Sequence, residues 1–300
     1  REQLKLFQRG LSVHQPLPNM FTEDMILRAP SADVMNKMAR AVLSLYSYDD
    51  APEDRSLESE MGKAIALIAR LPTIAAHAYA AKRHYFDNES LYLHRPQEGL
   101  GVAENFLYSV RHDNQFTEEE ARLLDLCLVL HAEHGGGNNS TFTTRVVTSS
   151  GTDTYSAMAA ALCSLKGPRH GGANLMVMQM MQNIRENLHD TEDDEELEAY
   201  LRKLLHKEAF DKAGLIYGMG HAVYSLSDPR EVVFKGYVEQ LAHEKGRDKD
   251  LALYNKIEHM APQLIAEERK IFKGVSPNVD FYSGFVSPWS CTRRCSPWPA

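Results

Sequence analysis

The chain has 300 residues, which is enough for one large domain or two ordinary ones. With 43% hydrophobic and 25% charged residues, it has the composition of a soluble globular protein. Its formal net charge of -8 argues against a general nucleic-acid binder, which would carry a basic surface, although local arginine and histidine residues can still hold a small anion. We find no apolar stretch that we expect to be long enough to cross a bilayer, and no secretory signal. We therefore expect a cytoplasmic protein without membrane partners.

Helical periodicity dominates the chain, and strand patterns are scarce. Ser31 is predicted as the N-cap of a first helix, in which Val34, Met38, Val42 and Leu45 recur at helical spacing. The spacing indicates that one face of this helix is buried.

Proline residues and capping patterns divide the rest of the helical segments. Pro72 predicts a break between a helix over residues 57–69 and another over residues 73–85. Thr117 and Glu120 have the spacing of a capping box, which predicts a helix start at this point. Further helices are expected at residues 155–165, 173–188, 232–245 and 251–272, with one more that follows the acidic run 190–198 and ends near residue 206.

The four cysteines do not form the pattern of a disulfide framework. Cys127 and Cys163 occur singly in apolar helical patterns, which predicts two reduced core residues. Cys291 and Cys295 fall in the unusual segment 287–300 (SPWSCTRRCSPWPA), which has no amphipathic pattern and is predicted to be a tail without a helix.

Four short segments combine chemically active residues with turn formers. Each places a His or an Asp beside Gly, Pro or Asn, where glycine allows unusual backbone angles and exposes nearby amides. Because His170 precedes two glycines and a predicted helix start, it is expected to stay neutral and to donate a hydrogen bond. The segments are residues 131–139 (HAEHGGGNN), 170–174 (HGGAN), 218–230 (GMGHAVYSLSDPR) and 277–284 (PNVDFYSG).

Each segment also has a purely structural interpretation. A single His at a helix end is more often a capping or core residue, and Asp280 is compatible with a simple turn. His131 and His134 are spaced i and i+3, but HAEH is not the HExxH pattern and no partner cluster accompanies it, so no metal site is predicted. The segment 218–220 is too short for a dinucleotide fingerprint and no strand precedes it.

In this order and approximate spacing, the four segments resemble the signature segments of the citrate synthase family, and the resemblance extends from about Phe21 to Val286. It implies an all-α, multi-helical fold, with a partial large domain at residues 1–169 and a smaller helical domain at residues 170–286. Family members are homodimers of the tricarboxylic acid cycle that condense acetyl-CoA with oxaloacetate to give citrate and CoA. These are substrates and products, so no permanently bound cofactor is expected.

The resemblance also implies a role for each matching residue. His170 is expected to polarise the thioester carbonyl, Asp280 to take a proton from the acetyl methyl group, and His221 to polarise the ketone of oxaloacetate. A neutral His that donates to the carbonyl oxygen would stabilise the enolate as the weak base removes the proton. The predicted binding residues are His134 and Arg230 for oxaloacetate, Asn138 and Ser140 as supporting groups, and Gly218, Met219 and Gly220 along CoA.

Two alternatives remain open at this point. One is a 2-methylcitrate synthase that uses propionyl-CoA, because one methylene changes discrimination by only about 1–3 kcal/mol. The other is an inactive truncated chain that binds only CoA or a partner subunit. This second alternative is considered because family members carry a further N-terminal portion, and also later arginines and helices, that have no counterpart in this sequence. We hypothesise a frameshift near residue 288, since the neighbouring reading frame permits a sequence that resembles the family's next helix.

Overall fold

A computed structural model describes residues 2–132, 136–168, 170–221, 224, 226–270 and 274–291 of the chain. In these residues the regular elements are all helices, and Met219 forms an isolated antiparallel bridge with Pro277. The predicted all-α fold is therefore confirmed. The chain divides into two compact units, Arg1–Gly171 and Gly172–Ala300, which we call unit 1 and unit 2.

Unit 1 is built from seven α-helices and two short helices of other types in its described residues. The core element is the 31-residue helix α3, against which α1, α2 and α4 pack. The helices are α1 (Glu2–His14), the π-helix η1 (Thr22–Leu27), α2 (Val34–Ser44), the 3-10 helix η2 (Leu45–Tyr48), α3 (Leu57–Asp87), α4 (Val102–Val110), α5 (Glu118–His131), α6 (Asn139–Ser149) and α7 (Thr154–Leu165).

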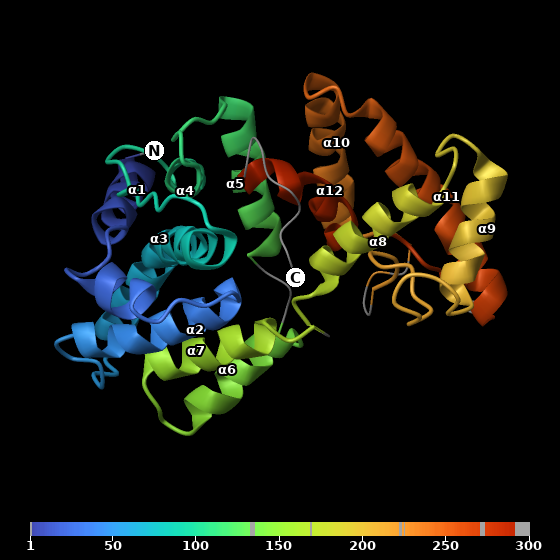
Figure 1. Ribbon diagram of the computed structural model, residues 1–300. Helices are drawn as coiled ribbons and strands as arrows, with labels where there is room; N and C mark the ends of the chain where they lie inside the picture. Colours follow the sequence, from blue (N-terminus) through green and yellow to red (C-terminus); the bar gives the residue numbers. More distant parts are fainter. Residues whose placement is uncertain are drawn as a thin grey trace. The chain divides into compact units, whose positions relative to one another are not determined.

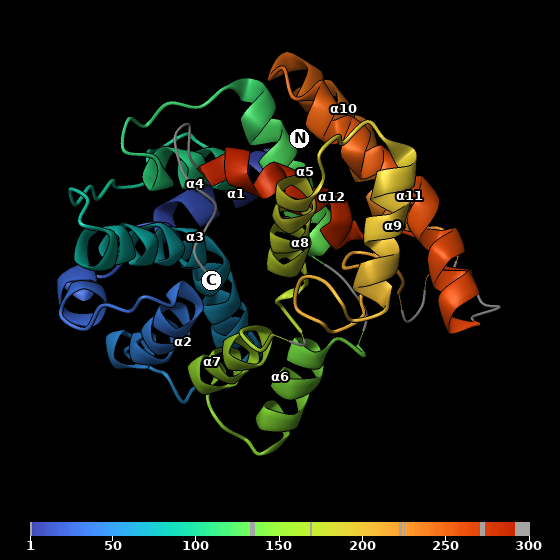
Figure 2. The same cartoon turned by 45° about the vertical axis from the view of Figure 1, so that its right-hand side comes forward.

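Helices α2, α7 and α6 lie side by side in unit 1, with α7 in the middle (Figures 1 and 2). Helix α7 buries Ala157, Ala159 and Ala161, whose small side chains allow its neighbours to approach closely. Tyr155 of α7 also joins the main hydrophobic core, which includes Phe21. This packing confirms the prediction of a buried helix at residues 155–165, and it places the end of α7 near the start of α6.

Unit 2 contains α8 (Ala173–Asn187), α9 (Asp194–Leu205), α10 (Pro229–Glu244), α11 (Asp248–Arg269) and α12 (Val279–Cys291) (Figure 1). Its core is aromatic where α11 meets α12. The ring of Tyr254 lies 5.2 Å from Phe281 and 5.0 Å from Phe285, measured between centroids. Because these large rings are almost fully buried, they fix α12, and with it Asp280, against the rest of the unit.

Three predictions about caps, helix breaks and burial in unit 1 are wrong. Asp33, not Ser31, caps α2, because the Asp33 side chain accepts the Asn36 N–H at 3.0 Å. Pro72 lies inside the continuous helix α3. A proline removes one helical hydrogen bond, and the burial of residues on both sides of Pro72 offsets that loss. Cys163 is exposed, because it lies on the outer side of α7, whereas Cys127 is partly buried.

The continuity of α3 also corrects the expectation about apolar runs. By length and composition alone α3 is apolar enough to cross a bilayer, but half of its most apolar stretch is buried inside the protein, as in a core helix. The prediction of no helix after Val286 is wrong for the first residues of that segment, since α12 continues through Pro288 to Cys291. Residues 292–300 lie outside the described residues.

Candidate active site

In unit 1, the N-terminus of α6 presents polar groups next to His170. Asn138 is the N-cap, and its side chain accepts the N–H groups of Ser140 and Thr141 at 2.9 and 3.1 Å. Ser140 follows in the first turn, and its N–H and hydroxyl both lie against Nε2 of His170. The predicted supporting residues Asn138 and Ser140 thus lie in the same turn beside His170. Asn138 orders the turn, and Ser140 contacts the imidazole ring.

His170 is held in one tautomer by Ser140. The Ser140 backbone N–H donates to Nε2 of His170 at 3.2 Å, and the Ser140 hydroxyl lies 2.7 Å from the same nitrogen. An N–H donates only to a nitrogen that carries a lone pair, so this contact selects the neutral ring with its proton on Nδ1. The Nδ1–H is then the hydrogen-bond donor of the ring.

A tight turn after α7 sets the position of His170. The backbone N–H groups of His170 and Gly171 both donate to the carbonyl of Gly167, at 2.9 and 3.1 Å. A Cβ at residue 171 would collide with the backbone carbonyl of Leu165, so only glycine fits there. This close approach explains the glycine that follows His170 in the sequence.

His134 lies outside the described residues, so its role in binding oxaloacetate stays a prediction. His131 ends α5, and its Nδ1 lies 2.8 Å from the carbonyl of Cys127, which is a local helix contact. In the described part of the chain, no group of three or more His, Cys, Asp or Glu side chains is placed to hold a metal ion.

In unit 2, the predicted CoA-binding loop pairs with the segment that leads into α12. The Gly220 N–H donates to the Ser276 carbonyl at 2.8 Å, and the Asn278 N–H donates to the Gly218 carbonyl at 2.9 Å. Gly218 has a φ of +83°, and a Cβ there would come within 2.7 Å of the Phe281 ring. Glycine is therefore required for both backbone angle and space.

His221 follows this loop and is also held in one tautomer. Its Nδ1 accepts the backbone N–H of Tyr224 at 3.2 Å, so the neutral ring carries its proton on Nε2. The ring of Tyr224 lies 4.9 Å from that of His221, and the Arg230 guanidinium lies 5.5 Å from the Tyr224 ring centre. Tyr224 therefore contacts both a predicted catalytic residue and a predicted binding residue.

Arg230 is oriented by a buried carboxylate. Its Nε and Nη2 donate to the two oxygens of Asp228 at 3.0 and 2.8 Å, and Asp228 is fully buried. Burial alone would raise the pKa of Asp228, but the Arg230 side chain and N–H hold it below its ordinary value. The same hydrogen bonds raise the pKa of Arg230. The pair thus stays ionised, and the fork of Arg230 is fixed in direction.

Asp280 lies in the first turn of α12, where its N–H donates to Oδ1 of Asn278 at 3.0 Å. The turn is tied to α8 through Ser283, whose hydroxyl accepts from the Asn174 side chain at 2.6 Å. Asp280 is thus part of a helix and not of a simple turn.

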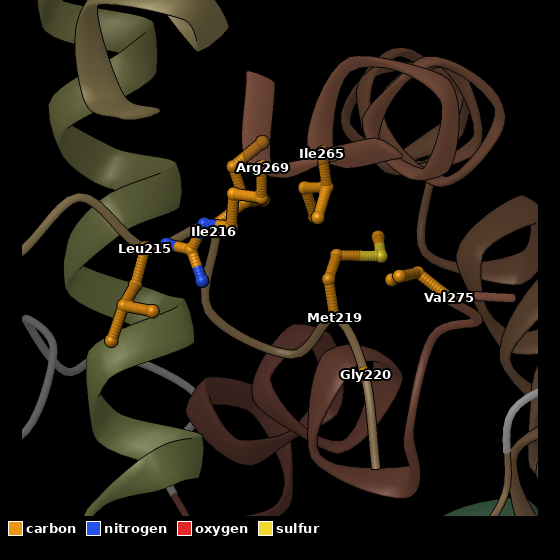
Figure 3. Close-up of a pocket in the computed structure, with 7 residues that line it drawn as sticks. All are labelled: Leu215, Ile216, Met219, Gly220, Ile265, Arg269 and Val275. Atoms are coloured by element: carbon orange, nitrogen blue, oxygen red, sulfur yellow. The ribbon is translucent and has the colours of Figure 1, made fainter. Parts of the chain in front are cut away.

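A cavity of about 150 Å³ borders the same loop of unit 2. Figure 3 shows Met219 and Ile265 facing this space, with Leu215 and Arg269 on its other side. Ile216, Gly220 and Val275 complete the lining. The walls are mostly apolar, and the Arg269 guanidinium donates to the Gly214 carbonyl at one edge.

Comparison with known proteins fits this arrangement. The model of the citrate synthase C-terminal domain matches residues 1–288. The chain belongs to the citrate synthase family. A citrate synthase of Deinococcus radiodurans is 36% identical over 286 residues, which cover 95% of this chain and 69% of that protein. The predicted family is therefore confirmed.

Solved citrate synthases share the fold. The crystal structure of the Pyrobaculum aerophilum citrate synthase has a TM-score of 0.78 at 28% identity and covers 97% of this chain and 69% of that chain. The ternary complex of carboxymethyl coenzyme A and oxaloacetate with the Thermoplasma acidophilum citrate synthase has a TM-score of 0.79 at 23% identity. It covers 99% of this chain and 71% of that chain, a likeness that shows the fold alone.

Sequence reasoning missed three residues that order the site: Tyr224, Asp228 and Asn278. All three lie within the segments 218–230 and 277–284, next to the His, Arg and Asp residues that were predicted to be functional. The Asp-Pro-Arg order contains a usable signal, because Asp before Pro is a common helix N-cap and Pro is favoured at the first helical position. No sequence signal indicates the ring contacts of Tyr224.

Proposed function

We propose that this chain condenses acetyl-CoA with oxaloacetate to give citrate and CoA. The proposal rests on the tautomers of two histidines, His170 and His221, in a chain of the citrate synthase family. His170 has its proton on Nδ1 and His221 has its proton on Nε2, as the contacts with Ser140 and Tyr224 require. Each histidine is thus a neutral donor, which is the form that polarises a carbonyl.

The proposed first step is removal of an acetyl methyl proton by Asp280. A carboxylate is a weak base for a thioester α-proton, so the enolate oxygen must be stabilised while the proton leaves. The Nδ1–H of His170 would donate to that oxygen without giving up its own proton. In this proposal the Ser140 N–H keeps the lone pair of His170 on Nε2, so that the ring proton stays on Nδ1.

The enolate carbon then attacks the ketone carbon of oxaloacetate. The Nε2–H of His221 would donate to the ketone oxygen, which takes on negative charge as the carbon–carbon bond forms. We assign an oxaloacetate carboxylate to Arg230, because Asp228 fixes its fork through Nε and Nη2 and so directs the remaining Nη1 edge. Hydrolysis of the citryl thioester would release CoA.

We assign the adenine end of CoA to the cavity beside Met219 and Gly220. Its apolar walls suit a flat aromatic ring, and Arg269 at the edge supplies a positive charge for a phosphate. No permanently bound cofactor is part of this scheme, so turnover should survive treatment with EDTA.

The decisive test is release of the CoA thiol from acetyl-CoA, with and without oxaloacetate, by the purified chain. The comparison removes the background from the protein's own cysteines. Asp280→Asn keeps the shape of the side chain and lacks the base, so it should abolish the oxaloacetate-dependent release. Absence of this release from the unmodified chain would overturn the proposal and favour the inactive alternative.

Propionyl-CoA in the same assay tests the second alternative. The relatives matched above are named citrate synthases, which does not favour a 2-methylcitrate synthase. We expect the ratio of kcat/KM to favour acetyl-CoA. A preference for propionyl-CoA would reverse this assignment.

We also propose that the chain works as a cytoplasmic homodimer. Four large apolar side chains on α5 and α6 are 45–64% exposed, and covering them would be favourable. They are Leu128, Val129, Phe142 and Val146. Sedimentation of the purified chain should give twice the mass of 33.9 kDa, and Phe142→Lys should shift it to the monomer.

A further inference from the structure

Asn278 contacts the two catalytic segments of unit 2 with one side chain. Its Nδ2 donates to the carbonyl of Gly220 at 2.9 Å, and its Oδ1 accepts the N–H of Asp280 at 3.0 Å. The Gly220 carbonyl belongs to the peptide group that leads into His221. One primary amide thus touches both the peptide group before His221 and the peptide group that carries Asp280.

We propose that Asn278 is a positioning residue that holds His221 and Asp280 in one fixed arrangement. This inference rests on the proposed function for its catalytic meaning, but the contacts stand independently of it. Reacting groups must be held within about 0.5 Å of the productive geometry, and a misplacement of about 1 Å can lower the rate about a hundredfold. A residue that binds both segments reduces their freedom to move separately.

Backbone pairing alone gives the two segments little support. Met219 and Pro277 form only an isolated bridge, flanked by one hydrogen bond from the Gly220 N–H and one from the Asn278 N–H. So short a ladder is marginal, because isolated strand pairs need a larger sheet or packed partner for stability. The Asn278 side chain adds a third connection at the end nearest His221.

The site uses a donor and an acceptor on two separate atoms, Nδ2 and Oδ1, and Asp and Ser side chains do not offer that pair. An N-cap needs only the acceptor, which Asp and Ser also supply. The Asn278→Asp and Asn278→Ser variants should therefore keep the cap of α12 and lose the donor to Gly220. Asn278→Ala should lose both. Asp193→Asn is the matched control, because Asp193 caps α9 in the same unit.

Amide hydrogen exchange tests whether the contact steadies the loop, whether or not the chain turns over. The Gly220 N–H donates to the Ser276 carbonyl, whereas the Gly220 carbonyl accepts from Asn278. With Asn278→Asp and Asn278→Ser, the Gly220 peptide loses the contact at its carbonyl, so its N–H should open from Ser276 more often and exchange roughly tenfold faster, as expected for a lost hydrogen bond of about 1.4 kcal/mol. The Asp280 amide should stay close to its original rate, and Asn278→Ala should accelerate both. Unchanged exchange at Gly220 in the Asp and Ser variants would overturn the proposal.

Kinetics then tests the consequence for catalysis. We expect Asn278→Asp and Asn278→Ser to lower kcat about 10–100-fold, by analogy with the loss of residues that orient a ligand-binding group. The infrared carbonyl band of bound oxaloacetate should show weaker polarisation, a change that simple loss of stability would not produce. If both variants keep the original kcat and carbonyl band, Asn278 is only a helix cap. If the unmodified chain is inactive, the proposed function fails while the exchange experiment still decides the bridging role.

Discussion

Glu231 in α10 is expected to destabilise unit 2 at neutral and alkaline pH, and glutamine in its place should remove that effect. The side chain is only 4% exposed, and in the described structure its Oε1 atom is buried without a hydrogen-bond partner. Burial raises the pKa of Glu231 to about 7, from an ordinary value of 4.5, and the negative charge of Glu258 adds to this shift.

The surroundings of Glu231 explain why its charged form is disfavoured. Glu258 of α11 and Asp228 at the start of α10 raise its pKa, whereas Lys235 lowers it. Lys235 is already paired with Glu258 at 2.6 Å, and the hydroxyl of Tyr282 from α12 donates to the same carboxylate. Lys235 is therefore already engaged with Glu258, and burial remains the largest cause of the raised pKa of Glu231.

The sign and size of the effect follow from linkage. Below pH 4.5 the carboxyl is protonated in both folded and unfolded chains, and the full stability is present. Between pH 4.5 and 7 the unfolded chain loses this proton while the folded chain keeps it, so stability falls as pH rises. Above pH 7 the loss reaches at most about 3 kcal/mol, since each pKa unit corresponds to about 1.4 kcal/mol.

Urea unfolding followed by far-ultraviolet circular dichroism at pH 5, 6, 7 and 8 measures this loss. The Glu231→Gln variant should differ little from the unmodified chain at pH 5 and should be up to about 3 kcal/mol more stable at pH 8. Glu239→Gln is the control, because Glu239 is exposed on the same helix. A constant stability difference across this pH range, or a Glu231 carboxyl carbon that titrates near pH 4.5 by NMR, would refute the reasoning.

Three further predictions concern single contacts. Ser140→Ala removes the hydroxyl 2.7 Å from His170 and should lower kcat about tenfold, equivalent to ~1.4 kcal/mol, at an unchanged unfolding midpoint. Gly218→Ala forces a Cβ against Phe281 at a φ of +83° and should reduce stability by about 2 kcal/mol in urea unfolding; an equally stable variant would contradict the packing. Thr117→Ala removes the hydroxyl that caps α5 and should cost about 1 kcal/mol, whereas Thr117→Ser should cost little.

Features that depend only on residues close together in the chain could be predicted from the sequence. The Thr117 capping box forms as predicted, because both of its partners lie within one turn of helix. The helix at residues 173–188 is found at Ala173–Asn187, since its pattern and flanking glycine are also local. The four motifs identified the family for the same reason: each is a short run of residues whose order is visible in the chain.

The sequence by itself therefore determined the all-α class, most helix positions and the family. Tertiary structure alone decided that α3 continues through Pro72, because packing on both sides of the proline outweighs its local preference. It alone paired Ser140 with His170, 30 residues apart, and Asn278 with Gly220, 58 residues apart. Such contacts depend on where helices and loops meet after folding, and neither periodicity nor capping patterns encode that meeting point.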